Sequence, residues 1–120
     1  MTDMATVAIE DGDSDVVIAR VAGEVDLSNA SLVGDRLAAA VPNHALGLVI
    51  DLSATTYLDS SGVGLLFDLA ARLRRRQQRL ALAVPPESSL HRVLGIVDAG
   101  SAMPIAGASD EAVARIRAAA

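Results

Sequence analysis

The sequence predicts an α/β protein with a mixed sheet of about four to five strands, which opens with a β-hairpin and continues with alternating helices and strands. Apolar, β-branched segments alternate along the chain with segments of helical periodicity. The 120 residues are enough for one hydrophobic core, and a hydrophobic content of 52% argues against disorder. No linker, repeat or low-complexity block divides residues 1–120, so we expect one domain.

The chain opens with two segments of strand character, residues 6–10 and 16–22. Between them, Asp11-Gly12-Asp13 has the composition of a tight turn, which predicts a hairpin. We expect Gly23 to end the second strand. Because a hairpin pairs its strands antiparallel and crossovers through helices pair theirs in parallel, the sheet should be mixed.

Helical and strand patterns alternate through the rest of the chain. A first helix is expected from a cap at Ser28 to about Val41, with one apolar face. The near-continuous apolar run over residues 46–52 is typical of a strand covered on both faces. The remaining expected elements are a helix over about 60–77, a strand over 80–84, a helix over about 87–97, a short strand over 103–106 and a final helix capped by Ser109.

Parallel strands would bring several polar side chains to one edge of the sheet, since the loops that follow such strands share that edge. The expected strands end near Ala22, Leu52 and Val84. The polar residues that follow them are Glu24 and Asp26, then Asp59 and Ser60, then Ser88. We therefore expect the binding region there.

The composition argues against several functional classes. The net charge is −5, which disfavours direct binding to nucleic acids or to anionic membranes. There is no cysteine, no signal-peptide pattern and no apolar run long enough to span a bilayer, so we expect a cytoplasmic protein. The two histidines, His44 and His91, lie in separate expected elements, and no His/Cys cluster predicts a metal site. Neither an enzyme nor a cofactor is indicated.

The segment from Asp59 to Gly64 contains the most informative pattern, Asp-Ser-Ser-Gly-Val-Gly, at the point where a loop becomes a helix. Glycine is disfavoured inside a helix, so Gly62 and Gly64 indicate that a small residue is needed there. One interpretation is that a serine caps the helix and the glycines ease packing. The other is that an exposed serine accepts a phosphoryl group, whose charge a helix N-terminus tolerates.

This motif, together with Gly23-Glu24-Val25-Asp26 upstream and Val-Leu-Gly-Ile-Val-Asp at 93–98, resembles the STAS domain family, and more narrowly its stand-alone bacterial anti-sigma factor antagonists. The resemblance covers essentially the whole chain. It implies that the unphosphorylated protein binds an anti-sigma factor that is also a serine kinase, and so releases the sigma factor. Phosphorylation of Ser60 would end that binding, and a metal-dependent serine phosphatase would restore the hydroxyl.

The resemblance also implies the residues of the partner-binding site. They are Glu24, Asp26, Asp59, Ser60, Ser61 and Gly62. Val25 and Val63 stand where leucine is commoner in the family, which is a conservative difference.

Two questions stay open from the sequence. The chain could instead be a constitutive STAS module, either a scaffold or a sensor of a small ligand or nucleotide in a larger signalling or transport assembly. The basic run from Arg72 to Arg79 is explained by solvated cations at a helix C-terminus, or by an acidic partner or anionic ligand.

Overall fold

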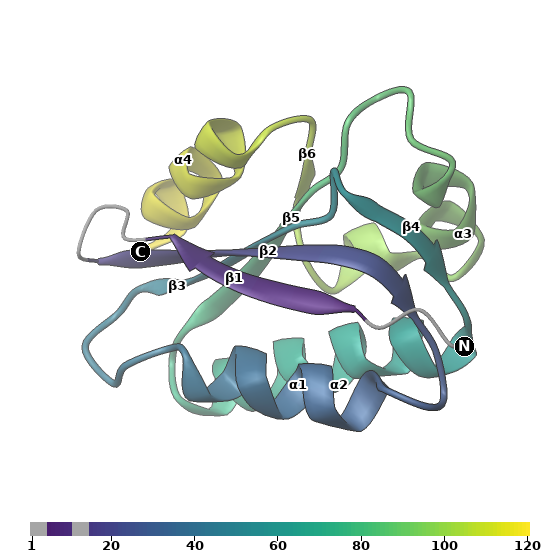
Figure 1. Cartoon of the computed structure of the whole chain (residues 1–120). Helices are drawn as coiled ribbons and strands as arrows, with labels where there is room; N and C mark the ends of the chain where they lie inside the picture. Colours follow the sequence, from purple (N-terminus) through teal and green to yellow (C-terminus); the bar gives the residue numbers. More distant parts are fainter. Residues whose placement is uncertain (1–4, 11–14) are drawn as a thin grey trace.

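The computed structural model describes residues 5–10 and 15–120, which form a sheet covered by helices (Figure 1). The expected turn at Asp11-Gly12-Asp13 lies outside the described residues. In chain order the elements are β1 (Thr6–Glu10), β2 (Val16–Val25), α1 (Ala30–Ala39), β3 (Gly47–Asp51), β4 (Thr55–Leu58), α2 (Ser60–Arg75), β5 (Arg79–Ala83), α3 (Leu90–Ile96), a 3-10 turn (Ala99–Ser101), β6 (Ile105–Ala106) and α4 (Ser109–Ala119).

The sheet is mixed, as predicted. Its order is β1-β2-β3-β5-β6, and β4 pairs with the far half of β2. β1 pairs with β2 antiparallel, and the other described pairings are parallel. The parallel strands therefore end in one direction, and this brings the loops after them to a common edge.

Helices cover both faces of the sheet. α1 and α2 lie side by side against one face, and α4 lies against the other (Figure 1). Leu37 of α1 and Leu73 of α2 belong to a core cluster of buried aliphatic side chains, which also includes Leu48 and Leu82 of the sheet. A smaller cluster under α4 is centred on Ile116. The core is built from aliphatic side chains.

β4 is a sixth strand that the sequence pattern does not predict, since residues 53–59 read as a loop. After β3 ends, the chain turns and Thr55 pairs with Gly23 of β2. The Thr55 hydroxyl donates a hydrogen bond to the Val21 carbonyl at 2.6 Å, which fixes the start of the new strand. β2 is long enough to pair with β3 along its first half and with β4 along its second.

Gly23 does not end β2, contrary to the prediction. The strand continues to Val25, with a shift in its pairing register after Gly23. The φ angle of Gly23 is 95°, a conformation that favours glycine. The glycine therefore bends the strand toward β4 instead of breaking it, and Glu24 lies within the strand.

Two predicted helix caps are wrong. Asn29, not Ser28, precedes α1, and the Ser28 hydroxyl donates to the Asp26 carboxylate. Ala108, not Ser109, occupies the cap position of α4, and the Ser109 hydroxyl donates to Asp51 at 3.3 Å. In both places the serine hydroxyl bonds a nearby carboxylate instead of the backbone N–H groups at the start of the helix.

Candidate functional site

Asp59 is the residue that fixes the start of α2. Its Oδ1 atom accepts hydrogen bonds from the backbone N–H groups of Ser61 and Gly62, at 2.8 and 3.0 Å. These are two of the N–H groups that a helix leaves without an internal partner. The cap is therefore the aspartate, and the interpretation in which a serine hydroxyl caps this helix is wrong.

The second oxygen of the same carboxylate reaches a different loop. Asp59 Oδ2 accepts a hydrogen bond from the backbone N–H of Leu27 at 3.1 Å, across 32 positions in the sequence. The Asp59 N–H in turn donates to the Val25 carbonyl at 3.2 Å. One aspartate thus joins the loop after β2 to the first turn of α2, because β2 and β4 are paired and end together.

The loop between β2 and α1 is closed by its own side chains. Asn29 donates from its amide to the Glu24 carbonyl at 2.8 Å, and its side-chain oxygen accepts from the Asp26 N–H at 3.0 Å. The Asp26 carboxylate accepts from the Ser28 N–H at 2.9 Å. These short bonds hold the loop in one shape, so that its carboxylates have a defined place beside α2.

Ser60 is the first residue of α2 and is exposed, whereas Ser61 is half-buried. Within the described residues the Ser60 hydroxyl makes no hydrogen bond, and the cap of the helix is made by Asp59. Its hydroxyl oxygen is therefore available to an external reagent.

The two glycines of the motif differ in their surroundings. A Cβ atom at Gly62 would lie 2.9 Å from the Val25 carbonyl oxygen and 3.0 Å from a Leu58 methyl carbon. Gly62 is thus required by the close packing of α2 on β2 and β4. At Gly64 a Cβ atom would meet no described atom within 4 Å. Gly64 instead borders a groove of about 440 Å³ between α1 and α2, which Ser61 also lines.

Two apolar side chains beside these residues were missed by the sequence analysis. Leu27 is 82% exposed and lies in the loop that Asp59 holds. Tyr57 is 49% exposed and is paired in register with Glu24. The sequence does contain a signal for Leu27, because it is the one apolar residue in the otherwise polar segment Asp26-Leu27-Ser28-Asn29.

The predicted partner-binding residues therefore lie together in one corner, at the ends of β2 and β4 and the start of α2. We call this corner the Asp59 corner and define it by Glu24, Asp26, Leu27, Tyr57, Asp59, Ser60, Ser61 and Gly62. Ser88 has a separate role, since its hydroxyl oxygen accepts from the Leu90 N–H at 3.2 Å at the start of α3.

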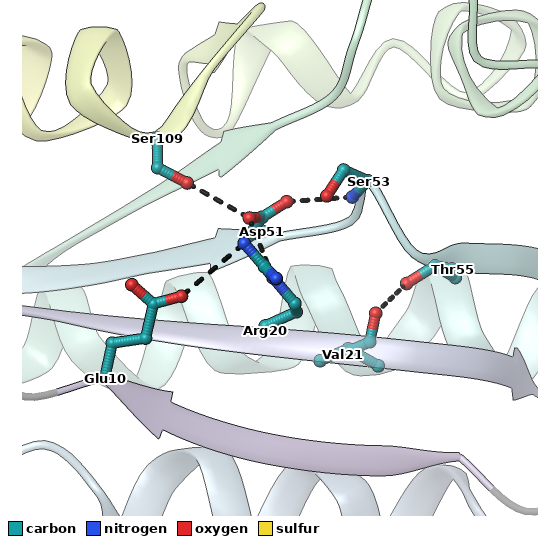
Figure 2. A network of polar contacts seen from close by, with 7 residues as sticks. All are labelled: Glu10, Arg20, Val21, Asp51, Ser53, Thr55 and Ser109. Carbon is teal, nitrogen blue, oxygen red and sulfur yellow. Dashed lines mark hydrogen bonds and ion pairs between the residues drawn. The ribbon is translucent and has the colours of Figure 1, made fainter.

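A second polar cluster lies on the α4 side of the sheet, around Asp51 at the end of β3 (Figure 2). Asp51 is 5% exposed, and Arg20 and Ser109 both donate to its Oδ2 at 3.3 Å. Its Oδ1 accepts from the Ser53 N–H at 2.9 Å. Burial acts to raise the pKa of Asp51, but the bonds from Ser53 and Ser109 and the charge of Arg20 together hold that pKa below its usual value.

The chemistry available in the Asp59 corner is that of a hydroxyl and carboxylates. Across residues 5–10 and 15–120, no group of three or more His, Cys, Asp or Glu side chains is arranged to hold a metal ion. His91 lies elsewhere, with its Nε2 atom 3.1 Å from the Val84 carbonyl oxygen. No helix in the described part of the chain has the length and apolar character to cross a membrane.

Comparison with known proteins places this geometry in a family. The sequence model of the STAS domain matches residues 8–112. An anti-sigma-B factor antagonist of Listeria monocytogenes is 34% identical over 77 residues, which cover 64% of this chain and 68% of the relative.

Solved structures share the fold. The crystal structure of an anti-sigma factor antagonist from Mycobacterium paratuberculosis has a TM-score of 0.82 at 25% identity, and the match covers 95% of each chain. The antagonist SpoIIAA of Bacillus, in its unphosphorylated form, has a TM-score of 0.69 at 21% identity over 93% of this chain and 98% of that chain. From the family match and the Listeria relative together, the chain belongs to the STAS domain family.

Proposed function

We propose that this protein is an anti-sigma factor antagonist that works by partner switching. Its unphosphorylated form binds an anti-sigma factor with serine kinase activity in the cytoplasm, and the sigma factor is released. Phosphorylation at Ser60 ends the complex, and a metal-dependent serine phosphatase restores it. Membership of the STAS domain family and the relatives named as anti-sigma factor antagonists support this role.

The observation that carries the proposal is the position of Ser60. It is an exposed serine at the first position of a 16-residue helix, and the cap of that helix is made by the neighbouring Asp59. A phosphoryl group can therefore be added without breaking a bond that holds the fold. The positive end of the helix dipole tolerates the added charge in the free protein.

A bound partner would not tolerate the same phosphate. Glu24, Asp26 and Asp59 already place negative charge in this corner, and a phosphoserine adds about −1.5 to −2 more. Burying such a group at an interface without a matching cation costs several kcal/mol. A loss of about 3 kcal/mol lowers affinity roughly 100-fold, which is enough for a switch.

The surroundings of Ser60 suit a protein partner. Leu27 and Tyr57 offer exposed apolar area, while Glu24 and Asp26 offer carboxylates at its margin. Apolar anchors with a polar margin are the usual composition of a protein interface. The complementary surface on the anti-sigma factor would combine an apolar pocket for Leu27 and Tyr57 with hydrogen-bond donors at its margin, and it would have no cation opposite Ser60.

The test combines a kinase assay with binding measurements. The protein is incubated with its cognate anti-sigma factor kinase and ATP, and the modified residue is located by phosphopeptide mass spectrometry. We expect phosphate on Ser60. We also expect Ser60→Ala to bind the kinase constitutively and Ser60→Asp to bind poorly. The control Ser89→Ala, at an exposed serine outside the Asp59 corner, should be phosphorylated normally.

Phosphate found only on Ser61 or Ser88 would contradict the proposal. So would equal partner affinity of the wild type, Ser60→Ala and Ser60→Asp, which would instead favour a constitutive STAS module acting as a scaffold or ligand sensor.

A further inference from the structure

A cavity of about 420 Å³ lies at the other end of α2 from Ser60, and the proposed function makes no use of it. Three arginines from three different elements line it: Arg74 of α2, Arg79 of β5 and Arg115 of α4. Among the residues that the structure describes, no carboxylate lines it. In a protein of net charge −5, this is a local concentration of positive charge.

No carboxylate within residues 5–10 and 15–120 forms an ion pair with any of these three arginines. In the part of the chain that the structure describes, the carboxylate-paired arginines are Arg20 and Arg117. Arg74 donates to the backbone carbonyl of Ala102 at 3.3 Å, and this bond holds its guanidinium at the cavity wall. Cavity arginines without carboxylate partners leave their donors available to an anion.

The helix dipole explains only part of this arrangement. Arg74 lies in the last turn of α2, where a cation is favourable in any case. Arg79 is the first residue of a strand, and Arg115 lies near the middle of α4. Neither position belongs to α2, so the dipole of that helix does not explain why arginine stands there. Both side chains nevertheless border the same cavity.

The backbone adds a donor. The N–H groups of Leu82 and Val84 point toward β6, where they donate to the carbonyls of Pro104 and Ala106 at 2.9 and 2.8 Å. Because alternate residues of a strand point their N–H groups the same way, the Leu80 N–H points to this edge also. β6 begins at Ile105, opposite Leu82, and therefore does not extend as far as Leu80. The edge of β5 at Leu80 borders the cavity instead.

The rest of the lining is apolar. Leu80 and Ile116 are buried side chains that form part of the lining, and Pro104 contributes another apolar surface. Small-molecule sites commonly combine apolar walls with a few convergent polar groups, in volumes of about 300 to 1,000 Å³. We propose that this cavity binds a small polyanion that carries phosphate or carboxylate groups, with its carbon part against the apolar wall.

The test is a titration of the ¹⁵N-labelled full chain with sodium pyrophosphate and, separately, with sodium citrate, at constant ionic strength. We expect saturable shifts of the Leu80 and Ala102 amide signals with at least one of them. A stronger response to pyrophosphate assigns phosphate chemistry to the site, and a stronger response to citrate assigns carboxylate chemistry. Either result supports the proposal.

Variants separate this site from general attraction of anions. The double variant Arg79→Gln/Arg115→Gln should lose affinity by about tenfold or more, since two charge-assisted contacts are removed. Arg75→Gln is the control, because Arg75 is an exposed arginine next to Arg74 in α2 that is not among the residues lining the cavity. The amide spectrum of each variant verifies that it is folded.

Two results would overturn the proposal. One is the absence of saturable shifts at Leu80 and Ala102 with both anions. The other is an equal loss of affinity in Arg75→Gln and in the double variant, which would mean that the anions respond only to the charge of the surface.

Discussion

Asp51 and Asp59 are two carboxylates at the carboxyl ends of strands, and they differ in what they hold. Asp51 ends β3, is 5% exposed and binds the side chains of Arg20 and Ser109, so it ties β2 and α4 together (Figure 2). Asp59 follows β4 and is half-buried, and its hydrogen-bond donors within the described part of the chain are all backbone N–H groups. The comparison shows that aspartates at the same end of a sheet can have different roles. Asp51 stabilises the fold, whereas Asp59 shapes an exposed surface.

Replacing Asp51 should produce the largest loss of stability. Asp51→Asn removes the charge that faces Arg20 and disturbs the acceptors for Ser53 and Ser109, so we expect the free energy of unfolding to fall by about 2 kcal/mol. Partner affinity should stay unchanged. Urea denaturation measures the loss, with Asp68→Asn, an exposed carboxylate on α2, as the matched control. Equal stability of the two variants would contradict the structural role.

Leu27 tests the surface side of the comparison. Leu27→Ala should leave the free energy of unfolding within about 0.5 kcal/mol of the wild type, because the side chain is 82% exposed. It should weaken binding to the anti-sigma factor by about 1.5 kcal/mol, roughly tenfold, if the leucine is buried in the complex. Calorimetric titration measures the affinity, with the exposed Leu32→Ala on α1 as the control. Equal affinities of Leu27→Ala and wild type would exclude this anchor.

Replacing Asp59 should lower the free energy of unfolding less than replacing Asp51 does, and it should also weaken partner binding. Asp59→Ala removes the cap of α2 and the bond to Leu27, and loss of such a cap costs about 1 kcal/mol. Asp59→Asn keeps a good capping residue and should cost less. Thermal denaturation measures both variants, and partner affinity is expected to fall more in Asp59→Ala. Equal losses in the two variants would mean that the charge, which both remove, and not the cap is the main contribution.

The pH dependence gives the smallest effect and concerns Asp51. Its folded pKa is held below the ordinary value of 3.8, so its contribution to stability is present above about pH 4 and is lost as the pH falls through the folded pKa. The difference in unfolding free energy between wild type and Asp51→Asn should therefore shrink below pH 4. Urea denaturation at pH 7 and pH 3 measures it. A difference that grows in acid would contradict the sign of this shift.

Much of the fold could be predicted from the sequence, because apolar periodicity marks each long element. β4 could not, since its four residues are too few for a clear alternation and its pairing depends on the bend at Gly23. The start of α2 at Ser60 was predicted correctly. Its cap was not, because Asp59, Ser60 and Ser61 are all good capping residues and only the backbone decides among them.

The site was predictable only where it follows from the order of the strands, and not where it depends on how distant segments pack. Parallel strands correctly suggested that Glu24, Asp26 and Asp59 would lie at one edge. The bond from Leu27 to Asp59 depends on the pairing of β2 with β4, which local sequence does not contain. The convergence of Arg74, Arg79 and Arg115 likewise depends on how α4 packs beside β5.

The central claim is that the exposed hydroxyl of Ser60 controls a protein complex through its charge. The most direct test is the affinity for the cognate anti-sigma factor, measured by calorimetric titration on protein phosphorylated fully at Ser60 and on the same protein after dephosphorylation. The account predicts roughly 100-fold weaker binding of the phosphorylated form, with recovery after dephosphorylation. Equal affinities of the two forms would contradict it.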